Sequence, residues 1–87
     1  MKVHVLDDFR REFARLPKRI QEKARKSLAQ LEENPFHPSL HTKRMRGIED
    51  VWESRVTLSY RFTFSWRGED IWLRRVGTHD ILRRESS

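Results

Sequence analysis

Apolar residues recur at two different spacings in the first part of the chain. Alternation over residues 2–6 predicts a short first strand. Intervals of three and four residues then predict a short helix that ends at Leu16 and a second helix that begins with Pro17. Asn34-Pro35 ends the second helix. We therefore expect two consecutive helices whose apolar faces need a sheet to cover.

The spacing changes to a period of two in the second half of the chain. Residues 36–46 lack any period, which indicates a loop. Residues 67–70 have the composition of a hairpin turn, and residues 85–87 are typical of a frayed tail. Three further strands are predicted, over residues 51–58, 60–66 and 71–76.

The resulting order of elements, β-α-α-β-β-β, predicts an α+β fold formed by one domain over residues 1–87. The two N-terminal helices are expected on one face of a mostly antiparallel four-stranded sheet, and the other face is expected to be open. An aromatic row must face the helices, because nothing else can bury it. This row comprises Tyr60, Phe62, Phe64 and Trp66.

The register of the hairpins follows from the same alternation, because directly paired residues of an antiparallel ladder share a face. A three-residue connection at residues 57–59 lets apolar residues meet apolar residues, whereas a two-residue connection does not. The next hairpin has Gly68-Glu69 at its tip. The predicted pairs are Val56–Tyr60, Ser54–Phe62, Trp52–Phe64, Arg55–Arg61 and Glu53–Thr63, followed by Trp66–Ile71, Phe64–Leu73, Thr63–Arg74 and Arg61–Val76.

This register places two guanidinium groups, those of Arg55 and Arg61, opposite each other on the open face. Such a pair is unfavourable by up to about 1 kcal/mol unless an anion comes between the two groups. Arg74, Glu53 and the flat ring of Trp72 are expected nearby, so the face suits a phosphate and a base. The alternative is a ladder of solvated charges in which Glu53 neutralises one Arg.

The composition points to an anionic partner. Lys and Arg number 19 against 13 Asp and Glu, which gives a formal net charge of +6. Nucleic acid is the first candidate and an acidic protein the second. The absence of Cys excludes a disulfide scaffold, and four scattered His make a structural zinc site unfavourable. The N-terminus does not resemble a secretory signal and no apolar run could span a bilayer, so we expect a soluble, cytoplasmic protein.

His79 is the strongest candidate for proton transfer. It follows Gly77-Thr78 at the end of the last strand, where its imidazole can reach the open face near Arg61. His41 leads into a basic stretch and is a weaker candidate for the edge of a site. The other two histidines have structural explanations: His4 is expected to be half-buried in the first strand, and His37 exposed in a loop.

Cations combined with one His suit RNA cleavage by the RNA's own 2′-hydroxyl. This reaction requires removal of the 2′-OH proton, stabilisation of charge on the phosphorane oxygens and protonation of the departing 5′-oxygen. Arg can perform the second task and His the first or third, and Glu53 or Lys43 could complete the acid–base pair. No P-loop, dinucleotide fingerprint or Ser nucleophile motif is present.

The chain also resembles the RelE/ParE superfamily of type II toxins from Lys2 to about Arg84. The resemblance rests on four motifs in this order: Leu16-Pro17-Lys18 before a basic helix, Met45-Arg46-Gly47 leading into Val51-Trp52-Glu53-Ser54-Arg55-Val56, Tyr60-Arg61-Phe62-Thr63-Phe64, and Val76-Gly77-Thr78-His79-Asp80. It implies a ribonuclease that cleaves mRNA in the ribosomal A site without a metal or other cofactor. It also implies a cognate antitoxin that blocks the toxin, with operator DNA bound through the pair and no membrane partner.

The resemblance carries over to individual residues. Arg61 matches the Arg that contacts the scissile phosphate, and Arg55 matches a basic residue on the preceding strand. Lys43 and Arg46 lie in the basic approach to the Gly, where branches of the superfamily place Lys, His or Glu. His79 matches the general acid/base His of the branch that uses histidine.

Two positions depart from the superfamily pattern. Glu53 stands where some RelE proteins have Lys. No Tyr or Phe follows His79, so Trp72 or Arg83 would have to stack on the substrate base. Two alternatives remain: a non-catalytic member of the superfamily, such as a ParE-like gyrase poison or an inert homologue, and an unrelated small basic nucleic-acid-binding domain.

Overall fold

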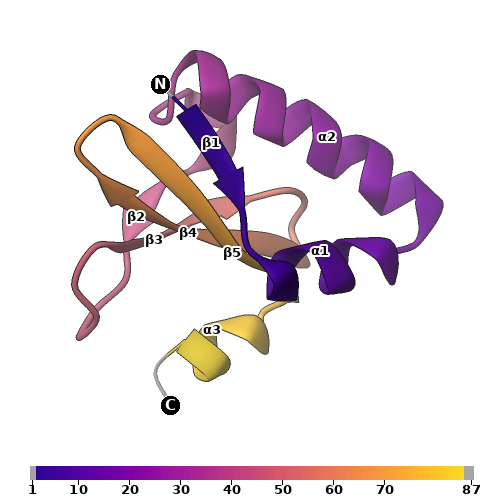
Figure 1. Ribbon diagram of the computed structural model, residues 1–87. Coiled ribbons are helices and arrows are strands. Elements are labelled where there is room, and N and C mark those ends of the chain that lie inside the picture. The colour runs from indigo at the N-terminus through magenta and orange to yellow at the C-terminus, as the bar shows by residue number, and fades with distance from the viewer. Residues whose placement is uncertain (1, 86–87) are drawn as a thin grey trace.

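The computed structural model describes residues 2–85, and the predicted order of elements is confirmed. Two short elements add to it: strand β2 and the C-terminal helix α3 (Figure 1). The elements are β1 (Lys2–Val5), α1 (Asp7–Ala14), α2 (Lys18–Glu33), a 3-10 turn η1 (Pro38–Leu40), β2 (Lys43–Arg44), β3 (Val51–Arg55), β4 (Tyr60–Arg67), β5 (Asp70–Thr78) and α3 (Ile81–Glu85).

The strands form one five-stranded sheet in the order β1-β5-β4-β3-β2. β1 runs parallel to β5, and the other neighbours are antiparallel, so the prediction of a mostly antiparallel sheet is confirmed. The predicted number of four strands is wrong. The fifth, β2, has only two residues, which is too short for an alternating pattern to appear in the sequence.

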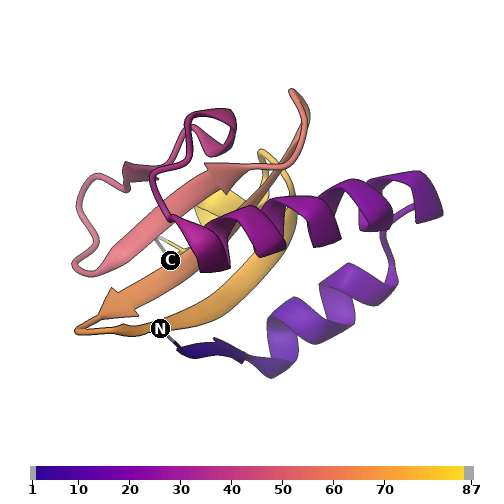
Figure 2. The ribbon, with the colours of Figure 1, turned by 90° about the horizontal axis from the view of Figure 1, so that it is seen from above.

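Both long helices cover one face of the sheet, as predicted (Figures 1 and 2). Apolar residues of α1 and α2, such as Phe9, Ile20 and Leu31, pack there against Phe62 and Phe64. The whole aromatic row faces this core, with the residues at its two ends partly buried. None of the helices in residues 2–85 is long and apolar enough to cross a membrane.

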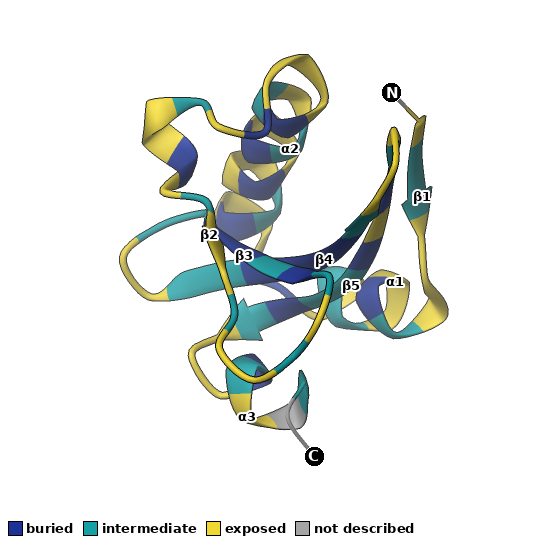
Figure 3. Cartoon of the chain, turned by 90° about the vertical axis from the view of Figure 1, so that its left-hand side faces the viewer, coloured by how far each residue is buried: buried dark blue, intermediate teal, exposed yellow. Residues whose placement is uncertain are grey.

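The opposite face is less open than predicted, because α3 lies across part of it (Figure 3). Ile81 is buried at the start of α3, and its Cγ2 lies 2.9 Å from where a Cβ would stand on Gly77 of β5. Only glycine leaves room for the helix to approach so closely. Of the predicted frayed tail, Glu85 belongs to α3, and Ser86 and Ser87 lie outside the described residues.

The predicted register is confirmed between β3 and β4 and for the first pairs between β4 and β5. The last two predicted pairs are wrong, since Thr63 pairs with Arg75 and Arg61 with Gly77. A β-bulge inserts Arg74 as an extra residue after the Phe64–Leu73 pair. Alternation alone does not signal such an insertion, which shifts every later pair by one residue.

Candidate functional site

Charged and polar side chains of β2, β3 and β4 meet on the face opposite the two long helices. The ladder pairs Arg55 with Arg61, and Glu53 with Thr63 on one side and Lys43 on the other. All five residues therefore share a face of the sheet. We call this group, comprising Lys43, Glu53, Arg55, Arg61 and Thr63, the basic strip.

Glu53 is the only acidic residue of the basic strip, and its side chain is just 6% exposed. Its Oε1 lies 3.8 Å from Lys43 Nζ and 3.9 Å from Arg61 Nη1. The contact with Arg61 is diagonal across the ladder and forms in the predicted register. Glu53 thus offsets one positive charge, as expected if it neutralises one Arg. The strip remains positive, because it holds three cations and one carboxylate.

Three polar atoms of the basic strip are buried without a hydrogen-bond partner. They are Arg55 Nε, Arg61 Nε and Thr63 Oγ1. A buried polar group without a partner costs about 1–3 kcal/mol. An anion brought to this strip would therefore meet two guanidinium groups, on adjacent strands, whose Nε–H groups lack an acceptor.

His79 directly follows β5, two residues after the glycine that pairs with Arg61. Its carbonyl oxygen accepts a hydrogen bond of 3.1 Å from the Leu82 N–H, which helps to start α3. The residue is exposed, and within residues 2–85 no hydrogen bond or ion pair joins its imidazole to Arg61. The fold thus brings the backbone of His79 to the end of the basic strip without tying its ring in place.

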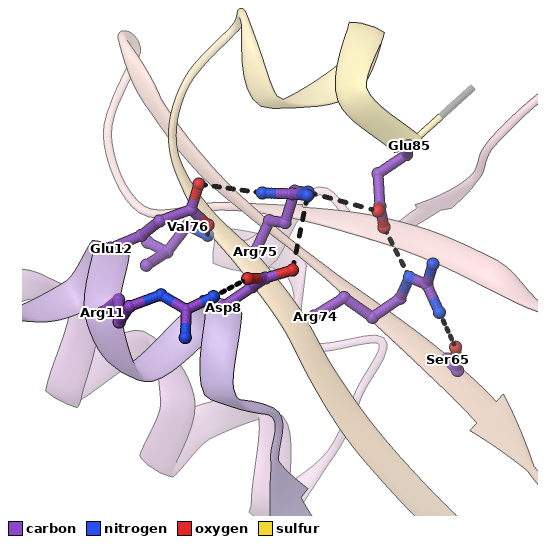
Figure 4. A network of polar contacts seen from close by, with 8 residues as sticks. All are labelled: Asp8, Arg11, Glu12, Ser65, Arg74, Arg75, Val76 and Glu85. Carbon is purple, nitrogen blue, oxygen red and sulfur yellow. Dashed lines mark hydrogen bonds and ion pairs between the residues drawn. The ribbon is translucent and has the colours of Figure 1, made fainter. Parts of the chain in front are cut away.

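Arg74 is paired with α3 instead of being free for a ligand (Figure 4). Its Nε donates a 2.6 Å hydrogen bond to Glu85 Oε2, and its Nη1 donates one of 3.1 Å to Ser65 Oγ. The side chain of Glu85 is only 3% exposed. A carboxylate from the chain's own C-terminal helix thus occupies the position beside Arg74 that an anionic ligand could take.

Arg75, which was not among the predicted site residues, is the centre of the same network (Figure 4). Its Nη1 donates to Glu12 Oε2 at 3.1 Å, and it forms ion pairs with Asp8 and Glu85 at 3.4 and 3.7 Å. It therefore joins α1, β5 and α3. The only signal for this role in the sequence was the pair of adjacent arginines in β5. The β-bulge makes Arg74 the inserted residue and lets Arg75 pair with Thr63.

Trp72 lies beside a separate hollow on the same face, near β1. Its ring stacks on His4, with centroids 3.9 Å apart and planes at 14°. The half-buried position predicted for His4 is confirmed. The hollow has a volume of about 330 Å³ and is lined by Leu6, Ser65, Arg67, Trp72 and Arg74.

The remaining candidates lie on exposed segments. His41 follows η1 with a left-handed backbone (φ 48°), and Arg46 lies in the connection between β2 and β3. No hydrogen bond or ion pair within the described chain joins either to the basic strip. Arg83 is exposed on α3. His37 is only partly exposed, because its Nδ1 accepts a hydrogen bond from Ser39 N–H and caps η1.

The described residues bring together no three His, Cys, Asp or Glu side chains that could hold a metal ion. The basic strip itself carries two guanidinium groups, one ammonium, one carboxylate and one hydroxyl, and His79 directly follows the adjacent strand β5. Such a set can bind a phosphate and exchange protons with it.

Comparisons with known proteins bear on the fold and the family of the chain. The model of the ParE-like toxin domain family matches residues 18–80, and a search of curated proteins finds no match. Among solved structures, the YoeB/ParE toxin from Agrobacterium tumefaciens is 19% identical and superimposes with a TM-score of 0.77, covering 91% of this chain and 99% of that one.

Two toxin–antitoxin complexes are also similar. RelE in the RelB–RelE complex from Methanococcus jannaschii is 15% identical, with a TM-score of 0.78 and 97% and 99% of the two chains covered. The intact E. coli RelBE complex gives 20% identity, a TM-score of 0.71 and coverage of 88% and 94%. These identities establish a shared fold, and the family model covers more than half of the chain. The chain therefore belongs to the RelE/ParE superfamily of toxins, as a ParE-like toxin domain.

Proposed function

We propose that this protein is the toxin of a type II toxin–antitoxin pair and that it cleaves mRNA in the ribosomal A site. The observation that carries the proposal is the basic strip, where Arg55 and Arg61 face each other with unpartnered buried Nε atoms. Two guanidinium groups at this spacing suit the non-bridging oxygens of one phosphodiester. A surface whose charges served only to keep the protein soluble would not place two like charges directly opposite each other.

The reaction we propose is attack by the 2′-hydroxyl on the adjacent phosphorus. A base takes the 2′-OH proton, the 2′-oxygen forms a bond to phosphorus, and the bond from phosphorus to the 5′-oxygen breaks. An acid protonates the 5′-oxygen, which leaves a 2′,3′-cyclic phosphate and a 5′-hydroxyl. Arg55 and Arg61 stabilise the negative charge that develops on the phosphorane oxygens, and His79 transfers one of the two protons.

Glu53 has two roles in this proposal. Its carboxylate holds Arg61 in place and draws Lys43 towards the phosphate position, since both cations lie within 4 Å of the same oxygen. Glu53 or Lys43 would then exchange the second proton. Arg46, Arg83 and His41 would contact the flanking RNA.

The partners follow from the same proposal. Two of the similar structures are complexes with an antitoxin, and the positive charge of this chain suits an acidic or amphipathic partner. We expect a cognate antitoxin to cover the basic strip and operator DNA to be bound only by the pair. Toxin, ribosome and mRNA would meet in the cytoplasm.

The second candidate is a non-catalytic ParE-like toxin, such as a gyrase poison. The observation that favours it is the neutralisation of cations by carboxylates from the chain itself, Glu53 beside Arg61 and Glu85 beside Arg74. A protein of this kind would keep its toxicity without an exposed phosphate site.

A translation extract with a reporter mRNA separates the two candidates. The wild-type protein is expected to cut the mRNA within codons, and Arg61→Ala and His79→Ala to lose at least about 100-fold in rate, the usual effect of removing one group that stabilises a transition state. Arg19→Ala is the matched control, because Arg19 is exposed on α2, which covers the other face of the sheet (Figure 1). Cleavage by both site variants at the wild-type rate would contradict the proposed site.

A further inference from the structure

The hollow beside Trp72 lies on the same face of the sheet as the basic strip but outside it. Trp72 pairs with Ser65 across β4 and β5, and His4 pairs with Trp72 across β1 and β5. Ser65 lies four residues along β4 from Arg61, so the two are separated by about 13 Å at about 3.3 Å per residue. The alternation of the strand places both on one face.

The indole of Trp72 has one covered side and one accessible side. His4 stacks against it at 3.9 Å in a nearly parallel arrangement, yet Trp72 remains 37% exposed and lines the hollow. His4 Nε2 lies 3.5 Å from Asp70 Oδ2 and has no hydrogen-bond partner within the described residues, so its contact with the indole is one of ring stacking. An exposed Trp with one face already packed presents a flat, fixed surface to a second ring.

The polar lining of the hollow includes two guanidinium groups, those of Arg67 and Arg74. Arg74 is held by hydrogen bonds to Ser65 Oγ and Glu85 Oε2, so its guanidinium cannot swing away from the hollow. Arg67 also lines the hollow; its side chain is 74% exposed, and its Nε lies 3.9 Å from Asp50 Oδ2 in an ion pair that is open to solvent. The volume of about 330 Å³ lies at the lower end of the range for small-ligand sites.

We propose that this hollow is a base-binding subsite for one nucleotide of a single-stranded RNA. The base stacks on the accessible face of Trp72, and the neighbouring phosphate meets Arg67, which is exposed beside the hollow. The inference rests on the proposed function, because the linkage to be cleaved would lie some 13 Å away on the basic strip.

His4 is a positioning residue in this subsite. It does not touch the RNA but fixes the angle of the indole by covering its other face. A flat ring without proton chemistry should serve equally well, so His4→Phe is expected to keep the affinity for RNA, whereas His4→Ala should lower it. If a histidine were needed for its hydrogen bonds, His4→Phe would bind as weakly as His4→Ala, which would contradict the positioning role.

The test uses a heptanucleotide RNA that carries a 2′-O-methyl group on every ribose and so lacks the nucleophile. Its dissociation constant is measured by fluorescence anisotropy at fixed salt for the wild type, Trp72→Ala and Trp72→Phe. The control is Phe36→Ala, because Phe36 is also an exposed aromatic residue (55%) but lies against Trp52 and Trp66 on the helix side of the sheet. A second series of oligonucleotides lacks one base at each position in turn.

We expect Trp72→Ala to bind about 10- to 100-fold more weakly, Trp72→Phe to lie between, and Phe36→Ala to match the wild type. Removing the base at one position should weaken binding to the wild type but not to Trp72→Ala, because the stacking partner is already gone. Equal affinity of Trp72→Ala and the wild type would overturn the subsite. The subsite would also be overturned if every abasic oligonucleotide bound the wild-type protein equally weakly, because the loss of affinity would then not depend on one base.

The outcome also separates this inference from the proposed function. If Arg61→Ala abolishes cleavage but Trp72→Ala binds normally, the nuclease proposal stands and the subsite is wrong. If neither Arg61→Ala nor Trp72→Ala changes binding or cleavage, this face does not bind RNA and both proposals fail.

Discussion

Glu53 is a buried carboxylate between two cations, and it sets the charge of the basic strip. Its Oε1 lies within 4 Å of both Lys43 Nζ and Arg61 Nη1. A buried charge is stable only when it is paired, because the surrounding protein solvates it poorly. Arg61 is held by the same pairing, with its side chain 13% exposed. The two residues therefore position each other.

Replacing Glu53 by Gln should destabilise the fold by about 1–2 kcal/mol. The amide keeps the shape of the side chain but leaves the charge of Arg61 without its partner in a poorly solvated position. Urea denaturation of the variant and the wild type measures the difference. Glu49→Gln is the control, because Glu49 is exposed in the β2–β3 connection. Equal unfolding midpoints for Glu53→Gln and the wild type would show that the pair contributes nothing.

Sequence alone predicted which residues pair in the basic strip but not which of them touch. Alternating apolar residues determine which face a side chain occupies and hence the Arg55–Arg61 pair. The contact between Glu53 and Arg61 depends on how two long side chains bend across the ladder, which periodicity does not describe. The roles of Arg74 and Arg75 were missed for a different reason, since one inserted residue exchanges their positions.

The C-terminal helix α3 shows how a short element can depend on contacts distant in sequence. It has five residues, far fewer than an isolated helix needs to be stable in water. Ile81 anchors its start on Gly77, and Glu85 anchors its end on Arg74 and Arg75. Because no apolar period fits in five residues, the sequence predicted no helix over residues 81–85, and of these only Glu85 was assigned to the frayed tail.

A methyl group at residue 77 tests this anchoring. In Gly77→Ala the new Cβ would stand 2.9 Å from Ile81 Cγ2, so α3 must shift, and we expect a loss of about 1–3 kcal/mol in the free energy of unfolding. Shortening Ile81 should relieve the clash. The double variant with Ile81→Ala is therefore expected to be more stable than the sum of the two single effects predicts, as urea denaturation would reveal. Strict additivity would mean that the two side chains do not meet.

In the molecule as a whole, one face of the sheet is apolar and contributes most of the core, and the other face is largely charged and polar. One face carries the helices and the apolar core, and the other carries the basic strip, the hollow beside Trp72 and α3. A domain of this size buries only about 60–65% of the surface of its unfolded chain. The α+β class and the layer arrangement were predictable because they follow from two long apolar periods, which are properties of many residues at once.

A partner that binds the folded state should therefore raise its thermal stability markedly. At a free antitoxin concentration 100 times its dissociation constant, mass action contributes about 2.7 kcal/mol. For a domain of this length that corresponds to a rise in Tm of roughly 10–20 °C. Calorimetry with increasing antitoxin measures it, with an unrelated acidic protein as the control for charge alone. A Tm that does not change while the complex forms would contradict this expectation.

The chemistry of the cleaved ends tests the central claim, that Arg61 and His79 act together on one ribose–phosphate linkage. Purified protein is added to programmed ribosomes, and the termini of the mRNA fragments are identified by mass spectrometry. We predict 2′,3′-cyclic phosphate and 5′-hydroxyl ends that disappear in Arg61→Ala and His79→Ala but persist in Arg19→Ala. Intact mRNA with the wild-type protein, or fragments with 3′-hydroxyl and 5′-phosphate ends, would contradict the account.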